Sequence, residues 1–132
     1  MERLLNEDLF SSDGSTLEEV VGELLCQQGL NLAIAESCTG GLVASRLTDV
    51  PGSSRYLHAG WILYSNDAKM MLLGVERKTL QTKGAVSSEV AEAMAVGARR
   101  IANVDFGIGV TGIAGPGGGT ADKPTGTVWV AL

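Results

Sequence analysis

LNLAIAESCTGG, residues 30–41, joins a short apolar run to a polar turn that ends in two glycines. Residues 30–35 are typical of a buried strand, and residues 39–48 carry apolar side chains on one helical face. The turn therefore lies where a strand is followed by a helix. The first N–H groups of a helix have no intrahelical partner, and its dipole is positive there, so the junction can hold an anion or a developing oxyanion. We interpret residues 35–41 as a candidate site.

The rest of the chain also alternates helices with short apolar strands. The capping pattern Ser15-Thr16-Leu17-Glu18 predicts a first helix that stops at Gly29. The other expected elements are a strand at 56–64, a helix capped within 65–67 and closed by Gly74, a further turn at 76–81, a helix from Ser87 or Ser88 to 102, and strands at 106–111 and 125–132. This alternation predicts an α/β fold, a three-layer α/β/α sandwich with a mixed sheet.

We expect one domain over residues 15–132, preceded by a tail at 1–14, because 132 residues are too few for two ordinary domains. The last expected strand runs to Leu132, where it would leave an abrupt sheet edge. We therefore expect the sheet to be truncated at the C-terminus. An open edge of apolar strands also makes a homo-oligomer such as a dimer plausible.

Composition excludes several functions. A net charge of -5 argues against nucleic acid as a partner, because affinity for phosphate backbones comes from clustered Lys and Arg. The apolar stretches are too short for a membrane span. Cys26 and Cys38, in a chain without a charged and apolar leader, suggest a reducing cytoplasm. With His58 as the single histidine, we expect no metal site.

Ser37 is a candidate nucleophile, although its position alone favours the N-cap of the following helix. A serine needs a base to attack at neutral pH. His58, the one histidine for a triad, is more simply a packed or surface side chain of its strand. Lys69 is the alternative base, because burial and a helix N-terminus both disfavour an ammonium ion. From position alone, a solvated charge beside Asp67 is the simpler interpretation of Lys69.

Other polar segments are ambiguous from residue type. Tyr64-Ser65-Asn66 could orient a lysine or a substrate amide, yet Asn66 could be a turn residue. The glycine loop at 112–119 could form a phosphate nest or a mobile linker, and it lacks the Gly-Lys-Ser/Thr ending of a P-loop. Cys38 could have a stabilised thiolate, but a small buried neighbour of Ser37 is the simpler interpretation.

Five ordered blocks carry a more specific signal than any one of these residues. Residues 35–41, 64–69, 84–87, 110–118 and 123–129 read AESCTGG, YSNDAK, GAVS, VTGIAGPGG and KPTGTVW. Together they closely resemble the CinA C-terminal domain family, over roughly residues 17–132. The chain is similar to stand-alone nicotinamide-nucleotide amidases of that family and to the same domain fused in larger competence/damage-inducible proteins.

The resemblance implies hydrolysis of the carboxamide of nicotinamide mononucleotide, giving nicotinate mononucleotide and ammonia in pyridine-nucleotide salvage, without a metal or cofactor. It implies Ser37 as nucleophile and Lys69 as base, with Tyr64 assisting the proton relay. The expected substrate-binding residues are Cys38, Thr39, Gly40, Gly41, Asn66, Thr111, Gly112 and Gly115. Backbone N–H groups of residues 38–41 are the expected oxyanion donors, while Thr111 and Gly112 would approach the ribose phosphate.

The family domain usually continues beyond the last block into a further strand and a terminal helix, so contacts from that part would be missing. Two other functions remain open from the sequence. The domain could be a non-catalytic nucleotide-binding or docking module related to competence and DNA-damage proteins. It could also be a Ser-Lys hydrolase of another small amide, because no residue in the sequence reads the pyridine ring directly.

Overall fold

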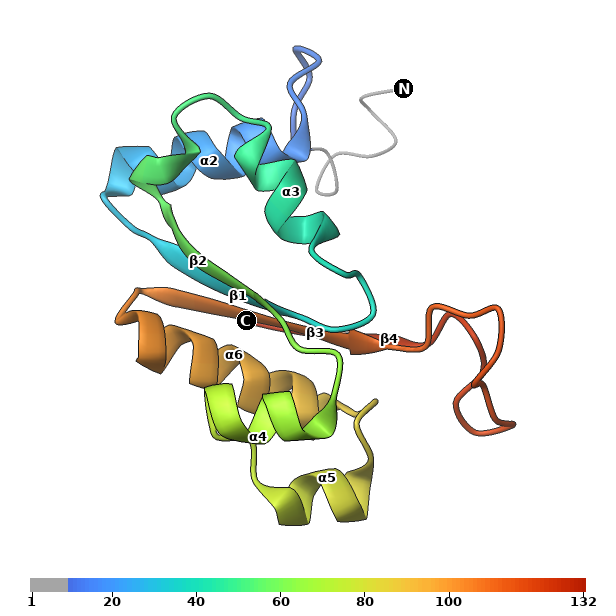
Figure 1. Ribbon diagram of the computed structural model, residues 1–132. Coiled ribbons are helices and arrows are strands. Elements are labelled where there is room, and N and C mark those ends of the chain that lie inside the picture. Colours follow the sequence, from blue (N-terminus) through green and yellow to red (C-terminus); the bar gives the residue numbers. More distant parts are fainter. Residues whose placement is uncertain (1–9) are drawn as a thin grey trace.

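The computed structural model describes residues 10–132, which form a four-stranded sheet between layers of helices (Figure 1). The strands are β1 (Leu32–Glu36), β2 (Leu57–Ile62), β3 (Phe106–Gly112) and β4 (Val128–Ala131), in the order β2-β1-β3-β4. β1 pairs in parallel with β2 and β3, whereas β4 is antiparallel to β3. The predicted mixed sheet is therefore confirmed.

Helices cover both faces of this sheet. One face carries α2 (Leu17–Gln28) and α3 (Leu42–Thr48), followed by the short 3₁₀ helix η1 (Ser53–Arg55). The other face carries α4 (Asn66–Leu73) and α6 (Ser88–Ala102), and α5 (Arg77–Lys83) packs against α6 (Figure 1). This arrangement confirms the predicted three-layer α/β/α sandwich. Within residues 10–132, no helix is long and apolar enough to cross a membrane.

The central strand β1 is buried along its whole length and separates two cores. Leu32 and Ile34 pack on the side of α2 and α3, whereas Ala33 and Ala35 pack on the side of α4 and α6. Successive side chains of a strand point to opposite faces. Glu36, the last residue of β1, therefore lies on the same face as Ile34, toward α3.

Helix α6 lies directly on β3 because the strand offers glycines where the helix approaches. A Cβ atom at Gly109 would collide with the carbonyl oxygen of Ala91, and one at Gly107 with that of Ala95. Glycine leaves room for such close backbone approach. This contact holds the carboxyl end of β3, where candidate residues Thr111 and Gly112 lie, against the helical layer.

The first helix begins one residue later than the sequence predicts. Thr16, rather than Ser15, is the N-cap, and it forms a capping box with Glu19. Ser15 instead donates to Asp13 Oδ1 at 2.7 Å, and Glu18 pairs with Arg46 of α3 at 2.8 Å. Two overlapping capping patterns are present in the sequence, and these outside partners decide between them.

The remaining expected boundaries differ modestly. The strand expected at 125–132 begins at Val128, because Gly126 N–H donates to Ile113 O and closes the preceding loop. Residues 1–9 of the expected tail lie outside the described residues, and residues 10–14 contain no helix or strand.

Candidate active site

Ser37 and Lys69 lie in contact at the carboxyl ends of the parallel strands. Ser37 directly follows β1, and Lys69 belongs to α4, which follows β2. Lys69 Nζ donates a hydrogen bond to Ser37 Oγ at 3.1 Å and another to the carbonyl oxygen of Leu63 at 2.6 Å. Lys69 is 1% exposed and Ser37 is 9% exposed. The fold thus buries a hydroxyl and an amine together, 32 residues apart in sequence.

The surroundings of Lys69 make its neutral form more accessible than in an exposed lysine. Burial lowers the pKa of Lys69 below its ordinary value of 10.5. The ion pairs among residues 10–132 are Arg46–Glu18 and Lys83–Glu89, so Lys69 has no carboxylate partner in this part of the chain. The interpretation of Lys69 as a solvated charge beside Asp67 is therefore wrong. A buried amine without a counter-charge can accept a proton from a neighbouring hydroxyl.

Glu36 explains why Ser37 is free to contact Lys69. One carboxylate oxygen of Glu36 accepts hydrogen bonds from Gly41 N–H and Val43 N–H, each at 3.1 Å, and the other accepts from Ala44 N–H at 2.8 Å. The buried carboxylate therefore supplies the cap of α3, whose N-cap residue Gly41 has no side chain to do so. The N-cap interpretation of Ser37 is wrong.

Sequence reasoning missed Glu36. Two features of the sequence could have indicated its role. Side chains of a strand alternate between the two faces of the sheet, which places Glu36 on the α3 face, and the next helix starts with a glycine that cannot cap it. An acidic residue before such a helix start can satisfy several of its first N–H groups.

The expected oxyanion donors differ in whether an oxygen of the protein already accepts a hydrogen bond from them. Gly40 N–H donates to Ser37 O at 3.2 Å, and Gly41 N–H is bound by Glu36. The N–H groups of Cys38 and Thr39 carry no hydrogen bond to an oxygen of residues 10–132. These two groups are the remaining candidates next to Ser37.

A cavity of about 300 Å³ opens beside the Ser37–Lys69 pair. The strand ends and the start of α4 contribute Ser37, Cys38, Tyr64 and Lys69. The other lining residues are Ala85, Val86, Thr111, Gly112, Ile113, Ala114, Gly115, Gly117 and Gly118. The cavity brings together seven of the expected residues, namely Ser37, Cys38, Tyr64, Lys69, Thr111, Gly112 and Gly115.

Four expected residues do not line this cavity: Thr39, Gly40, Gly41 and Asn66. Asn66 is exposed as the first residue of α4. Gly41 and Gly40 stand at the start of α3, as described above. Thr39 Oγ1 is buried without a hydrogen-bond partner among the described residues. Ligand contacts by these four residues, including one by the backbone N–H of Thr39, stay predictions.

Tyr64 and His58, the aromatic and histidine candidates, differ in their position relative to the cavity. Tyr64 lines the cavity and is 79% exposed, so its ring is accessible at the mouth. The other aromatic side chain of this region, Trp61 of β2, packs against the core on the α4 and α6 side. His58 is exposed on β2 and does not line the cavity, which disfavours a Ser37–His58 triad.

The walls next to Ser37 are tightly fitted. Thr111 Oγ1 donates to Ala85 O at 2.8 Å, so the threonine hydroxyl holds the wall together. A Cβ atom at Gly112 would lie 2.9 Å from Cys38 Sγ and 2.7 Å from Thr127 O.

Burial raises the pKa of the Cys38 thiol, which disfavours the thiolate as a competing nucleophile. Within residues 10–132, no group of three or more His, Cys, Asp or Glu side chains could hold a metal ion.

Comparison with known proteins gives the family of this fold and cavity. The sequence model of the CinA C-terminal domain matches residues 14–132. The chain belongs to the CinA C-terminal domain family. A CinA-like protein of Geotalea uraniireducens is 57% identical over 128 residues, which are 97% of the chain and 30% of that relative. A CinA-like protein of Acidobacterium capsulatum is 52% identical over 132 residues, 100% of the chain and 32% of that relative. The CinA domain described here thus spans less than a third of the length of these curated relatives.

Solved CinA structures share the fold. The competence-damaged protein (CinA) superfamily protein from Escherichia coli has a TM-score of 0.84 and 37% identity, over 96% of this chain and 76% of that chain. The competence/damage inducible protein CihA from Agrobacterium tumefaciens has a TM-score of 0.79 and 45% identity, over 89% of this chain and 74% of that chain.

Proposed function

We propose that this CinA domain hydrolyses the carboxamide of nicotinamide mononucleotide to nicotinate mononucleotide and ammonia, in the cytoplasm. The single observation that carries the proposal is the buried contact of 3.1 Å between Lys69 Nζ and Ser37 Oγ at the side of a cavity. A serine with an adjacent base is the arrangement required for nucleophilic attack on an amide.

In the first step, Ser37 Oγ attacks the amide carbon while the neutral amine of Lys69 accepts the hydroxyl proton. Lys69 Nζ is held by the carbonyl oxygen of Leu63, which fixes its direction relative to Ser37. The proton then passes from Lys69 to the leaving nitrogen, the C–N bond breaks, and ammonia departs. Tyr64, at the mouth of the cavity, is the candidate to assist this relay.

In the second step, water attacks the ester formed at Ser37, and Lys69 accepts its proton. Return of that proton to Ser37 Oγ breaks the ester bond, restores the free serine and releases the carboxylic acid, which loses its remaining proton to solvent as the carboxylate. In both steps negative charge develops on the carbonyl oxygen. Cys38 N–H and Thr39 N–H, which carry no hydrogen bond to an oxygen of the described residues, are the candidate donors to that oxygen.

The volume of the cavity, about 300 Å³, is at the lower end of the range for ligand sites. The cavity therefore encloses only part of a small nucleotide. The glycines of residues 112–118 form one side of it and bring backbone close to any bound ligand. Backbone N–H groups in such a loop favour an anion, which supports placing the ribose phosphate there. Such binding depends mainly on local N–H groups rather than on the net charge of the chain.

A substrate series tests the proposal. Ammonia release is measured from nicotinamide mononucleotide, nicotinamide riboside and free nicotinamide, together with the mass of each product. We expect nicotinate mononucleotide as product and a kcat/KM for the mononucleotide at least about tenfold above that for the riboside, the size of effect expected for one charged hydrogen-bonded group. Equal rates on all three amides would favour a hydrolase of another small amide. Tight binding by calorimetry without turnover would favour the nucleotide-binding module.

A further inference from the structure

The turn between α5 and α6 has an unusual set of hydrogen-bond partners. Its four successive carbonyl oxygens, at residues 83–86, each accept a hydrogen bond from a side chain. Ser87 Oγ donates to Gly84 O at 2.9 Å, and Thr111 Oγ1 donates to Ala85 O. The other two carbonyls are bound by one side chain from a distant segment, Lys123.

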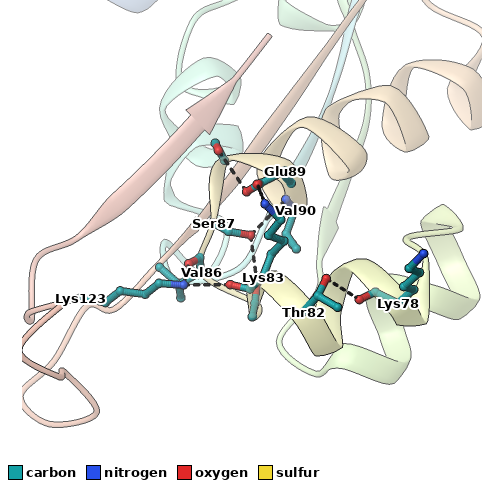
Figure 2. Close-up of polar contacts among 10 residues, drawn as sticks. Lys78, Thr82, Lys83, Val86, Ser87, Glu89, Val90 and Lys123 are labelled. Carbon is teal, nitrogen blue, oxygen red and sulfur yellow. Dashed lines mark hydrogen bonds and ion pairs between the residues drawn. The ribbon is translucent and has the colours of Figure 1, made fainter.

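Lys123 reaches the turn from the loop that joins β3 to β4. Its Nζ donates to Val86 O at 2.6 Å and to Lys83 O at 2.9 Å, spanning the turn (Figure 2). An ammonium has three donors and no acceptor, so it can bind two carbonyls at once. Hydrogen bonds from a charged donor are stronger than neutral ones. This contact links segments 37 and 40 residues apart in sequence.

The two linked segments both line the cavity. Ala85 and Val86 belong to the turn, whereas Ile113, Gly115 and Gly118 belong to the loop. The loop is closed at its base, where Ile113 N–H donates to Thr127 O and Gly126 N–H donates to Ile113 O. Lys123 itself is anchored by a local turn, in which its N–H donates to Thr120 Oγ1. Lys123 does not line the cavity.

We propose that Lys123 is a positioning residue that holds the glycine-rich loop against the turn at 83–87 and so keeps the cavity in shape for its ligand. The proposal rests on the proposed function for its kinetic consequence, but the contact itself is independent of the substrate. Because glycine-rich backbone has many accessible conformations, a loop of this composition needs such an anchor to hold one arrangement. Lys123 acts through the wall and has no part in the Ser37–Lys69 chemistry.

Three variants test this role. Lys123→Met keeps the length of the side chain and removes its donors, and Lys123→Arg keeps charge and donors. Lys78→Met is the matched control, because in α5 the carbonyl oxygen of Lys78, and not its ammonium, contacts Thr82 (Figure 2). Thermal unfolding first establishes that each variant is folded.

Hydrogen exchange then measures the contact without any substrate. We expect the hydrogen-bonded backbone amides of the turn and the loop, those of Gly84, Ile113 and Thr120, to exchange at least about tenfold faster in Lys123→Met than in the parent chain, as local opening becomes easier. Lys123→Arg should recover part of the protection, and Lys78→Met should match the parent. Unchanged exchange at both segments in Lys123→Met would overturn the proposal.

Kinetics on nicotinamide mononucleotide give the second readout. We expect Lys123→Met to raise KM by about tenfold or more with kcat changed less than about threefold, since the lost contact shapes binding rather than the reacting atoms. An unchanged KM in a folded variant with faster exchange would overturn the positioning role. If the parent chain shows no turnover, the proposed function fails, and calorimetric titration with the same mononucleotide replaces KM: weaker binding by Lys123→Met supports the role, and equal binding overturns it.

Discussion

Lys69 Nζ lies 3.1 Å from Ser37 Oγ, in a contact that joins the segment after β1 to the helix after β2. The relationship depends on the parallel pairing of the two strands, which brings their carboxyl ends to one edge of the sheet. Leu63 contributes to it twice, because its N–H donates to Glu36 O at 2.7 Å and its carbonyl oxygen accepts from Lys69. The geometry of the pair is thus fixed by backbone on both sides.

The rate should depend on the protonation of Lys69. Only the neutral amine can accept the proton of Ser37, and burial lowers the pKa of Lys69 below 10.5. We expect kcat/KM for nicotinamide mononucleotide to rise with pH through that lowered pKa and then level off. The profile is measured above about pH 7, where a phosphate monoester with a second pKa of about 6 no longer titrates. A rate that falls as pH rises from 7 would contradict a lysine base.

The same residue should make stability depend on pH. Between the lowered pKa of Lys69 in the folded chain and its ordinary value of 10.5, the unfolded chain binds more protons than the folded chain. The free energy of unfolding contributed by this group therefore rises with pH in that window. Urea unfolding should show the parent gaining stability relative to Lys69→Met as pH approaches 10. Parallel curves for the two proteins would show that Lys69 has the same pKa in both states.

Glu36 should be important for folding rather than for chemistry. Its carboxylate accepts three backbone N–H groups at the start of α3. Glu36→Gln replaces an acceptor oxygen by a donor, and we expect a loss of about 2 kcal/mol in the free energy of unfolding, as for other charged hydrogen bonds. The control Glu23→Gln, on the exposed side of α2, should change it by less than about 0.5 kcal/mol. Equal effects in urea unfolding would refute the capping role.

Sequence patterns were sufficient for the helices but not for the site. Local signals such as Ser65 before α4, Ser87 before α6 and Gly29 after α2 lie within a few residues of the ends they determine. Ser37 and Lys69 each have a commonplace alternative role, and the contact that distinguishes the two roles depends on strand pairing. From the sequence, only the family resemblance indicates that Ser37 and Lys69 act together.

Glu36 was missed for the same physical reason. A carboxylate at the end of a strand has no local partner in the sequence, and its three N–H donors are five to eight residues ahead. The expectation that the N–H groups of residues 38–41 all face an oxyanion did not consider the Glu36 carboxylate as a competing acceptor. It takes Gly41 N–H, and Ser37 O takes Gly40 N–H.

Gly112 should resist any side chain. A methyl group there would meet Thr127 O at 2.7 Å and Cys38 Sγ at 2.9 Å. We expect Gly112→Ala to lower the free energy of unfolding by about 1–3 kcal/mol, the usual range for overpacking. At Gly117 an added Cβ has no neighbour within 4 Å, so Gly117→Ala is the matched control for stability. Thermal or urea unfolding compares the two, and a Gly112→Ala protein as stable as Gly117→Ala would contradict the crowding.

The most direct measurement is ammonia release from nicotinamide mononucleotide by the parent chain, Ser37→Ala and the control Ser45→Ala, each with its fold established. Ser45 is exposed on α3, close to Ser37 in sequence but outside the cavity. We predict that Ser37→Ala lowers kcat by at least about a thousandfold, as for loss of a serine nucleophile, while Ser45→Ala retains the parent rate. Turnover by a folded Ser37→Ala protein at the parent rate would contradict the account.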